Sequence, residues 1–386
     1  MPIQVCVMTS AHPTLDVRIF HKECRSLARG GYAVTLIAPA EADREVDGIH
    51  LRAFPIYRNR MKRFLFGAVT MYRLAMNAGA DIYHFHDPEL IPIALLLRAR
   101  GKKVVYDVHE DLPKTVSYKA YVPKWLRVPL QMILKVVEDL ASGAMSGLIC
   151  ATTPIAERFL KVAYRAVVHN YPLLREFPTD SAATDPEAGD YIAYVGARIT
   201  LGRGAMEMVQ AMSLMPADLK IRLKIAGAFD PPQLPEILSK LTGWNRIQAL
   251  GVLGRAEVAE LLEHARGGLV LLHPEPNYLN AQPVKLFEYM GAGIPVIASD
   301  FPVWRNIVET AGCGLLVNPL DPKTIGEAIE YLWSHPSEAS EMGRRGRKAV
   351  ETQYNWEREE KRLLQFYNRL TGVQADATPA HIEAPA

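Results

Sequence analysis

The sequence YVGARITLGRGAMEMVQAM at residues 194–212 runs from a strand, through a turn that contains glycines, into a segment of helical period. It restarts a pattern that already fills residues 3–170, in which short runs rich in Val and Ile alternate with longer helical segments. That alternation is typical of a parallel sheet covered by helices on both faces. Because the pattern occurs twice, we predict an α/β protein of two doubly wound, Rossmann-like domains. They are expected to face one another across a cleft, and ligands of such sheets bind at the carboxyl ends of the strands.

The strands that this alternation predicts fall into two series. Those of the first domain are expected at 3–8, 33–38, 81–85, 103–108, 147–152 and 166–170. Those of the second domain are expected at 191–196, 219–227, 246–251, 267–272, 294–299 and 313–318. Three helical segments follow the last strand, near 322–334, 336–351 and 354–371.

The domain boundaries follow from these series. We place an N-terminal domain at 1–170 and a C-terminal domain at 191–353. Between them, residues 171–190 are rich in Pro, Asp and Ala and show neither period, which predicts a linker. A helix at 354–372 ends the folded part, and the tail at 373–386 is expected to be disordered because it has few large apolar residues.

The composition is that of a globular protein and excludes several classes. Of the 386 residues, 49% are hydrophobic and 22% are charged, which argues against intrinsic disorder and against a disulfide miniprotein. The 44 Lys and Arg against 42 Asp and Glu leave a net charge of +2, so bulk charge does not indicate nucleic acid as a partner. The four cysteines show no metal-ligand spacing, and no stretch reaches the roughly 20 apolar residues of a membrane-spanning helix. We therefore expect a cytoplasmic protein.

Two common nucleotide-binding classes are disfavoured by the ends of the predicted strands. The first strand ends in MTSAHPTLDVRIF at 8–20, without the glycine spacing that lets a dinucleotide pyrophosphate approach the backbone. No GxxxxGK[ST] sequence occurs, which excludes a P-loop NTPase.

The turn within 194–212 carries Gly196, Gly204, Arg198 and Arg203. The start of a helix offers free N–H donors and the positive end of a dipole, and two guanidinium groups nearby would complete a site for a diphosphate. The alternative is that the glycines serve only a tight turn and both arginines are solvated.

A second candidate segment is HPEPNYLNAQPVKLFEYMGAGIPVIASDFP at 273–302, which contains a short helix that starts near Pro283. Glu288 lies in that helix one turn after Lys285. These two residues are either an exposed i,i+3 ion pair or a functional pair. In the functional interpretation, the Glu288 carboxylate accepts both ribose hydroxyls of a nucleotide, and Lys285 faces the phosphates.

This segment, after the YVG…RG opening, resembles the donor-binding signature of glycosyltransferase family 4, whose members are retaining enzymes of the GT-B fold. In that family two glutamates stand eight positions apart; the second holds the ribose and the first touches the donor sugar. Glu288 matches the second, whereas the first falls on Asn280. An amide still binds sugar hydroxyls as donor and acceptor, but without charge. By position, Arg203 would take the role of the family's phosphate-binding lysine, with Arg198 assisting.

The resemblance covers nearly the whole chain. The segments 16–39, 85–90 and 104–113 are similar to a bacterial branch of the family involved in surface polysaccharides. The resemblance also implies that the helix near 354–370 crosses back to the first domain.

His109 follows the fourth predicted strand of the first domain and is expected to face the cleft. It is a functional group, a satisfied histidine beside Asp107, Glu110 and Asp111, or part of a metal cluster, although the spacing lacks a convincing ligand set for a metal. Family members resemble this chain in having a histidine here that contacts the donor sugar, so the resemblance assigns that role to His109.

Weaker candidates for the acceptor side follow the other strands of this domain. His86 and Asp87 end a strand, and the alternative for them is capping of the helix that starts near Pro88. Asp16 and Arg18 follow the first strand and are expected to line the acceptor site, although an Asp at a helix start is more often a cap.

The resemblance implies a retaining glycosyltransferase that moves a sugar from a nucleotide-diphosphate sugar to a polysaccharide or lipid-linked acceptor, in the synthesis of cell-surface glycans. The expected catalytic residues are His109, Arg198 and Arg203, and the expected donor-binding residues are Gly196, Gly204, Asn280, Lys285 and Glu288. We expect neither a metal nor a cofactor, because fixed cations neutralise the diphosphate and no DxD-type sequence is present. Two alternatives are a sugar-nucleotide epimerase of similar fold and, because of Asn280, a non-catalytic subunit that binds nucleotide sugars.

Two segments of the first domain, 57–76 and 117–136, interleave Lys and Arg with Phe, Tyr and Trp. This composition suits an anionic membrane surface and a lipid-linked acceptor. Buried amphipathic helices with a solvated basic face would look the same. If the first interpretation holds, the protein lies peripherally on the inner face of the membrane.

Overall fold

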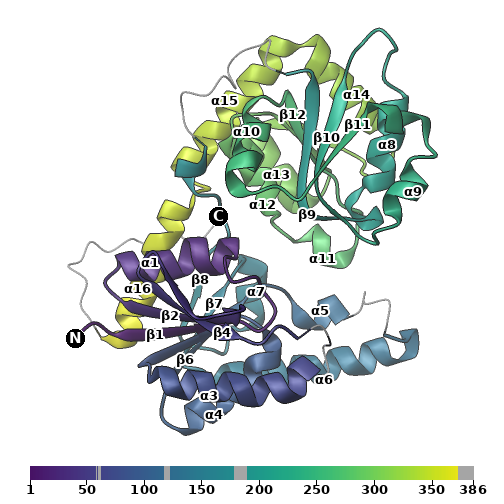
Figure 1. Ribbon diagram of the computed structural model, residues 1–386. Helices are drawn as coiled ribbons and strands as arrows, with labels where there is room; N and C mark the ends of the chain where they lie inside the picture. The colour runs from purple at the N-terminus through teal and green to yellow at the C-terminus, as the bar shows by residue number, and fades with distance from the viewer. Residues whose placement is uncertain (58, 60–61, 117–121, 178–188, 373–386) are drawn as a thin grey trace. The chain divides into compact units, whose positions relative to one another are not determined.

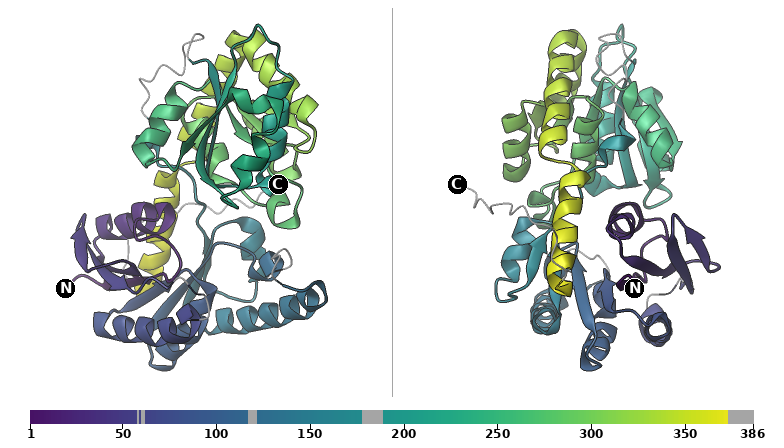
Figure 2. Two further views of the ribbon diagram at one scale, coloured as in Figure 1. Left: turned by 45° about the vertical axis from the view of Figure 1, so that its right-hand side comes forward. Right: turned by 90° about the vertical axis from the view of Figure 1, so that its left-hand side faces the viewer.

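The structure, a computed structural model, describes residues 1–57, 59, 62–116, 122–177 and 189–372. These residues form two compact units (Figure 1). Unit 1 comprises Met1–Asn170 together with the chain from Glu359 onward, and unit 2 comprises Tyr171–Arg358. Each unit holds its own, largely parallel sheet with helices packed against it (Figure 2). The predicted α/β class with two Rossmann-like domains is therefore confirmed.

The sheet of unit 1 has the strand order β3-β4-β2-β1-β5-β6-β7-β8, and every neighbouring pair except β3 and β4 is parallel. The strands are β1 (Gln4–Met8), β2 (Ala33–Pro39), β3 (Arg44–Val46), β4 (Ile49–Phe54), β5 (Ile82–Phe85), β6 (Lys103–Val108), β7 (Gly147–Cys150) and β8 (Arg165–Val167). The central strands are buried on both faces, which explains their continuous apolar sequence.

The hairpin of β3 and β4 is absent from the predicted strands. These two strands pair antiparallel, with Arg44 opposite Leu51. Asp47 and Gly48 form the two-residue turn between them, with φ angles of 53° and 74°. Positive φ at both positions is typical of a type I′ turn, and an Asp-Gly pair between two strands is the sequence signal for it.

The connections of unit 1 carry helices that cover its sheet. They are η1 (Val17–Cys24), α1 (Arg25–Arg29), η2 (Arg63–Gly67), α3 (Ala68–Ala78), η3 (Pro88–Leu90), α4 (Ile91–Ala99), α5 (Leu112–Val116), α6 (Lys124–Ala144) and α7 (Thr153–Arg158). Among the described residues, no helix is long and apolar enough to span a bilayer.

Unit 2 has a six-stranded parallel sheet of order β11-β10-β9-β12-β13-β14. Its strands are β9 (Tyr191–Ile199), β10 (Arg222–Phe229), β11 (Ile247–Gly251), β12 (Gly267–Val270), β13 (Val296–Ser299) and β14 (Gly314–Val317). Its helices are η4 (Leu174–Glu176), η6 (Leu201–Arg203), α8 (Ala205–Ser213), α9 (Leu234–Leu238), η7 (Thr242–Arg246), α10 (Arg255–Glu263), α11 (Pro276–Leu279), α12 (Val284–Gly291), α13 (Pro302–Ala311), α14 (Pro322–Ser334) and α15 (Pro336–Thr352).

The segment that was predicted to begin the linker is part of unit 2. Tyr171 and Phe177 are only 6% and 4% exposed, and both pack in the core of that unit. Residues 178–188 of the predicted linker lie outside the described residues, and so does the predicted tail at 373–386. The last helix, α16 (Trp356–Thr371), begins in unit 2 and ends in unit 1.

Candidate functional site

The turn after β9 is shaped by glycines. Gly204, between η6 and α8, has a φ of 75°, and a Cβ there would lie 2.8 Å from Cβ of Leu271. The fold therefore requires glycine at this position. Gly196 differs, because a Cβ there would meet the side-chain nitrogen of Lys285 at 3.1 Å. This glycine leaves room for a site residue.

Lys285 lies in the first turn of α12. Its Nζ atom stands 3.6 Å from the ring centroid of Tyr194 and is buried, although the rest of the residue is half-buried. Among the described residues, this nitrogen has no hydrogen-bond partner. Burial and then the charge of Arg203 lower the pKa of Lys285 well below its usual range, against the opposing effect of Glu288. A buried amine with a π face on one side and no acceptor is suited to an anion.

The two arginines of the turn differ in their surroundings. Arg203 ends η6 and is half-buried near Lys285 and Tyr194, where its charge acts on both groups. Arg198 is 70% exposed and forms an ion pair of 3.0 Å with Asp230. Arg203 therefore fits the expected phosphate contact better than Arg198, which is solvated.

Glu288 faces inward from α12 and is 5% exposed. Its Oε1 atom accepts a hydrogen bond of 2.7 Å from Nη1 of Arg255. Glu288 is therefore not the exposed partner of Lys285 that the i,i+3 spacing offered as an alternative, and that interpretation is wrong. The same guanidinium binds Glu176.

Asn280 follows α11 and is exposed. The indole nitrogen of Trp304 donates a hydrogen bond of 2.6 Å to the carbonyl of the next residue, Ala281. This bond anchors the loop that carries Asn280, and the Asn280 side chain remains on the surface.

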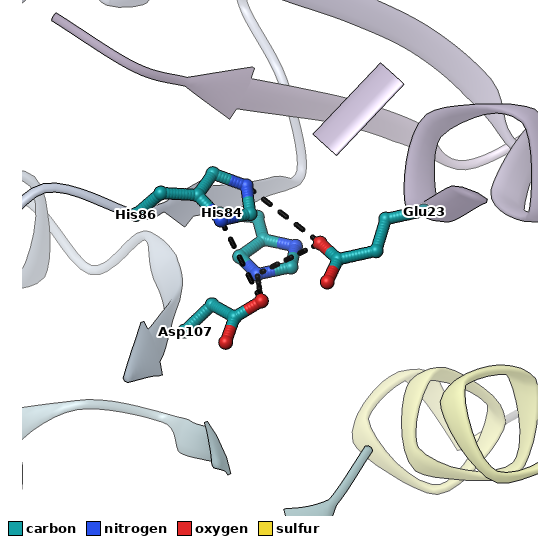
Figure 3. A group of neighbouring side chains, drawn as sticks. All are labelled: Glu23, His84, His86 and Asp107. Atoms are coloured by element: carbon teal, nitrogen blue, oxygen red, sulfur yellow. Dashed lines mark ion pairs between the residues drawn. The ribbon is translucent and has the colours of Figure 1, made fainter. Parts of the chain in front are cut away.

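In unit 1, four side chains converge beneath the carboxyl ends of β5 and β6 (Figure 3). They are Glu23, His84, His86 and Asp107, all of them buried. His109 continues this group outward, with Nε2 at 3.0 Å from Nδ1 of His86 and 3.3 Å from Oδ2 of Asp107. The His109 side chain is 20% exposed, so it is the solvent-facing end of the network.

Arg18 is buried, which contradicts its expected place on the acceptor side. It is 4% exposed; its Nε and Nη2 atoms donate to Asp107 at 3.0 to 3.1 Å, and Nη1 donates to the carbonyl of Val168 at 3.0 Å. Its Nε atom also lies 2.9 Å from Oε1 of Glu23. The whole guanidinium is occupied by the protein. Asp16 is the N-cap of η1 and accepts from the backbone N–H groups of Arg18 and Ile19, so the capping alternative describes it.

The other acceptor-side candidates are also occupied. His86 is 2% exposed and has no surface to offer an acceptor. The Asp87 carboxylate does not cap the helix after it. Instead it accepts from Thr9 Oγ1 at 2.8 Å and Ser10 N at 2.6 Å, and pairs with His12 at 3.1 Å.

The buried cluster has the residue types of a zinc site, since two imidazoles and two carboxylates offer atoms that all lie within 4.8 Å of one another. Arg18, however, already engages both carboxylates. With Arg18 positive and both carboxylates negative, one further proton balances the charge, whereas a divalent cation would exceed it. Burial and then Asp107 raise the pKa of Glu23 well above its usual range. Arg18 thus offsets part of the negative charge that a metal ion would need, while the Nε2 atoms of His84 and His86 have no hydrogen-bond partner among the described residues.

Two family models match the chain on either side of the unit boundary. Residues 17–170 match "Glycosyltransferase Family 4", and residues 177–349 match "Glycosyl transferases group 1". The chain is a family 4-like glycosyltransferase of the GT-B fold. The predicted family and enzyme class are therefore confirmed.

Relatives of this glycosyltransferase are distant but cover most of its length. It is 22% identical over 353 residues to the phosphatidyl-myo-inositol mannosyltransferase of Mycobacterium leprae, an alignment that covers 87% of this chain and 88% of the relative. Sucrose-phosphate synthase from Thermosynechococcus elongatus superposes with a TM-score of 0.77 at 19% identity, over 96% of this chain and 100% of the other. The Anabaena protein HepE in complex with UDP-glucose gives 0.70 at 12% identity, with the same coverage of both chains. At these identities the solved structures show the fold alone.

Several residues of the glycosyltransferase that shape these sites carry no local sequence signal. Arg255 precedes Glu288 by 33 positions, and Glu176 lies in the segment predicted as a linker. Glu23 is one charged residue among several in its helix, so only the fold shows that it meets His84.

Proposed function

We propose that the protein is a retaining glycosyltransferase that moves a sugar from a nucleotide-diphosphate sugar to a polysaccharide or lipid-linked acceptor of the cell surface. The observation that carries this proposal is the buried nitrogen of Lys285, which has no acceptor among the described residues. It lies near Arg203 and one helical turn before Glu288. A nucleoside diphosphate supplies the complement: phosphate oxygens for the nitrogen and ribose hydroxyls for the carboxylate.

The proposed chemistry follows from the charges that develop during transfer. The bond from the diphosphate oxygen to the anomeric carbon breaks, a hydroxyl oxygen of the acceptor forms the new bond to that carbon from the same face, and the hydroxyl proton passes to the departing diphosphate. In the transition state the sugar gains positive charge and the diphosphate gains negative charge. Cations at the leaving group then lower the barrier. Arg203 and Lys285 take that role, with the exposed Arg198 assisting. The contact of His109 with the sugar is carried over from the family resemblance. No carboxylate is assigned as a nucleophile. When the acceptor attacks the anomeric carbon from the face on which the diphosphate leaves, no covalent intermediate with the protein is needed.

The names of the relatives support the choice of substrates. The relatives that match most of the chain are phosphatidyl-myo-inositol mannosyltransferases, names that state a mannosyl group and a lipid acceptor. HepE was solved with UDP and with UDP-glucose. We take these names as grounds for a nucleotide-sugar donor and a lipid-linked acceptor, and for testing both UDP- and GDP-sugars.

The test is to incubate the protein with UDP-glucose, UDP-galactose and GDP-mannose, with and without a bacterial lipid extract, and to follow the products by NMR. Release of one nucleotide, with the anomeric configuration of the donor kept in the sugar product, is the expected result. The Lys285→Met variant should release none. An altered nucleotide sugar without release would indicate the epimerase, and donor binding without turnover would indicate the non-catalytic subunit that Asn280 brings into consideration.

We further propose that unit 1 lies on an anionic membrane surface through helix α6. This helix has 21 residues, of which only Glu138, Ala141 and Ser142 are buried. Its exposed apolar side chains recur every three to four positions; they are Trp125, Leu126, Val128, Met132, Ile133, Val136, Val137 and Leu140. Exposed apolar area of this extent is unusual unless something covers it. Lys124 lies on the same helix and provides charge of the sign that suits anionic lipid, whereas Lys135 is paired with Asp139.

The other basic segment, 57–76, also has exposed apolar side chains. Phe64, Leu65, Phe66 and Val69 are exposed there, while Arg58 and Arg60 lie outside the described residues. The membrane proposal is tested by sedimentation with vesicles of phosphatidylglycerol and of phosphatidylcholine. Trp125→Ser combined with Leu140→Ser should abolish binding to the anionic vesicles. Leu320→Ser, which alters an exposed leucine of unit 2, serves as the control. Unchanged sedimentation of the double variant would exclude α6 as the contact.

A further inference from the structure

We infer that Arg255 is a positioning residue of the nucleotide site, which holds the Glu288 carboxylate in the orientation that accepts the ribose hydroxyls. This inference rests on the proposed function, because it concerns how the same site recognises its nucleotide. Arg255 lies at the start of α10 and reaches Glu288 on α12.

One guanidinium joins two carboxylates at this point. Nη1 of Arg255 donates to Oε1 of Glu288 at 2.7 Å. The other edge of the guanidinium, through Nε and Nη2, donates to the carboxylate of Glu176. The Glu288 side chain is 7% exposed, that of Glu176 17% and that of Arg255 29%. Glu176 therefore fixes the plane of the guanidinium, and the guanidinium in turn fixes Glu288.

This arrangement suits recognition of a ribose. The two hydroxyls of a ribose are donors with a fixed separation, and a carboxylate accepts both only if its plane is turned toward them. An ionised carboxylate has about four acceptor positions, so Arg255 takes one on Oε1 and leaves acceptor positions on both oxygens. A Glu side chain without such a partner samples several rotamers, and ordering it on binding lowers affinity.

Arg255 also balances charge. Glu288 is negative and is expected close to a diphosphate that is itself negative, so without compensation the two would repel each other. A guanidinium at 2.7 Å offsets the charge of the carboxylate without competing for the ribose side of it. Arg255 thus offsets the negative charge of the Glu288 carboxylate and holds it in the orientation that accepts the ribose hydroxyls.

A merely structural ion pair would behave differently from a positioning residue. If Arg255 only stabilised unit 2, its loss would lower the melting temperature and would reduce the affinity for all nucleotides by the same factor. If it acts through Glu288, its loss matters most for nucleotides that carry both ribose hydroxyls.

The experiment is calorimetric titration of the full chain with UDP, GDP and their 2′-deoxy counterparts. We expect Arg255→Gln to lower the affinity for the ribonucleotide that the wild type binds by about 10-fold. The affinity for its 2′-deoxy form should fall by less than about 3-fold, because Arg255 and the 2′-hydroxyl act through the same contact with Glu288. In a Glu288→Gln background, Arg255→Gln should have almost no further effect. Arg255→Lys, which keeps the charge but not the planar fork, should also lose discrimination.

Two matched variants complete the test. Glu176→Gln leaves the bond from Arg255 to Glu288 in place and should keep most of the preference for ribose. Arg344→Gln removes an arginine of unit 2 that forms an ion pair with Glu341 on α15, and should change nothing. Equal losses for ribo- and deoxynucleotide in the Arg255 variants, or no loss at all, would overturn the inference. A wild type that binds no nucleotide would overturn the proposed function itself, so the two failures are distinguishable.

Discussion

The two units place charged side chains near the carboxyl ends of parallel strands, but they treat those charges in opposite ways. In unit 1, Arg18 donates to Asp107 and to the carbonyl of Val168, and its Nε lies 2.9 Å from a Glu23 oxygen. In unit 2, the nitrogen of Lys285 is buried and has no acceptor among the residues that the structure describes. Groups that satisfy one another stabilise the fold, whereas a buried polar atom left without a partner is costly unless a ligand completes it. By this criterion Lys285 marks a candidate ligand site in unit 2, and Arg18 is part of the architecture of unit 1, although the Nε2 atoms of His84 and His86 beside it also have no hydrogen-bond partner among the described residues.

Two lysines make the same comparison at the scale of one residue. Lys22 in unit 1 is fully buried and donates to Oδ1 of Asn170 at 2.6 Å and to its carbonyl at 3.3 Å. Lys285 in unit 2 stands on the ring of Tyr194 instead. A substitution by methionine keeps an unbranched apolar side chain about as long as the carbon stem of lysine and removes the nitrogen, so it separates the two roles.

The largest expected effect follows from that substitution. Lys285→Met should lower nucleotide affinity at least about 100-fold, because a hydrogen bond to a charged phosphate is lost, and should leave the free energy of unfolding unchanged or higher. Lys22→Met should lower the free energy of unfolding by about 2 to 3 kcal/mol, since Asn170 loses its donor, and should not affect the affinity of unit 2 for nucleotide. Calorimetric titration and urea unfolding check both. If Lys285→Met lost stability and kept its affinity, the comparison would fail.

The second prediction concerns pH and the buried histidines of unit 1. Burial lowers the pKa of His84 well below its usual value and that of His86 to about 4, whereas burial raises the pKa of Glu23. Between about pH 4.5 and 6.5 the unfolded chain therefore binds protons on both histidines that the folded chain lacks, and the raised pKa of Glu23 opposes part of this difference. Because two histidines stand against one carboxyl group, the stability of unit 1 should fall as the pH drops through this window, by about 1.4 kcal/mol per pH unit for each net proton.

Unfolding midpoints in urea at pH 6.5, 5.5 and 4.5 measure that slope. His86→Asn removes one of the two protons of the unfolded state, so its stability should change little across the same window. A wild-type slope near zero would show that the cluster holds its charges differently from this account.

The third prediction is that nucleotide binding takes up a proton. The pKa of Lys285 lies well below its usual range in the free protein because of burial and Arg203, and a phosphate anion beside it raises that pKa again. Uptake should amount to at most one proton and should be visible as a binding enthalpy that depends on the ionisation enthalpy of the buffer. It should vanish in Lys285→Met if that variant is titrated at high nucleotide concentration. Uptake that persists there would have another source.

The smallest effects are expected at the glycines of the turn after β9. Gly196→Ala brings a methyl group within 3.1 Å of the Lys285 nitrogen, so nucleotide affinity should fall about 3- to 10-fold with little change in stability. Gly204→Ala strains a backbone with φ of 75° and crowds Leu271, so it should lower stability by about 1 to 2 kcal/mol. Thermal unfolding and titration distinguish the two. Equal losses of stability in the two variants would contradict the assignment of Gly196 to the binding site and of Gly204 to the fold.

Features with a local period or local punctuation could be predicted from the sequence. The strands of both sheets, and helix α12 between Pro283 and Gly291, follow from apolar runs and from Pro and Gly at helix ends. The hairpin of β3 and β4 was overlooked even though Asp47 and Gly48 signal it. The predicted linker failed at Tyr171 and Phe177, whose burial depends on a core that forms far along the chain.

The candidate site was predictable only where its residues lie close together in the sequence. Lys285 and Glu288 share a helix, so their spacing is informative. The expectation that Arg18 lines the acceptor site is wrong, because a charged residue at a helix start does not show which way the helix faces. Arg255 could not be assigned, since the fold alone brings it to Glu288.

The most direct test of the central claim is calorimetric titration of UDP and of GDP into the wild type and into Glu288→Ala. If unit 2 holds a nucleoside diphosphate by its ribose and phosphates, the wild type should bind one of the two selectively, and Glu288→Ala should abolish that binding. If Glu288→Ala binds as tightly as the wild type, the ribose contact is elsewhere. If neither nucleotide binds the wild type, the ribose and phosphate assignments fail together.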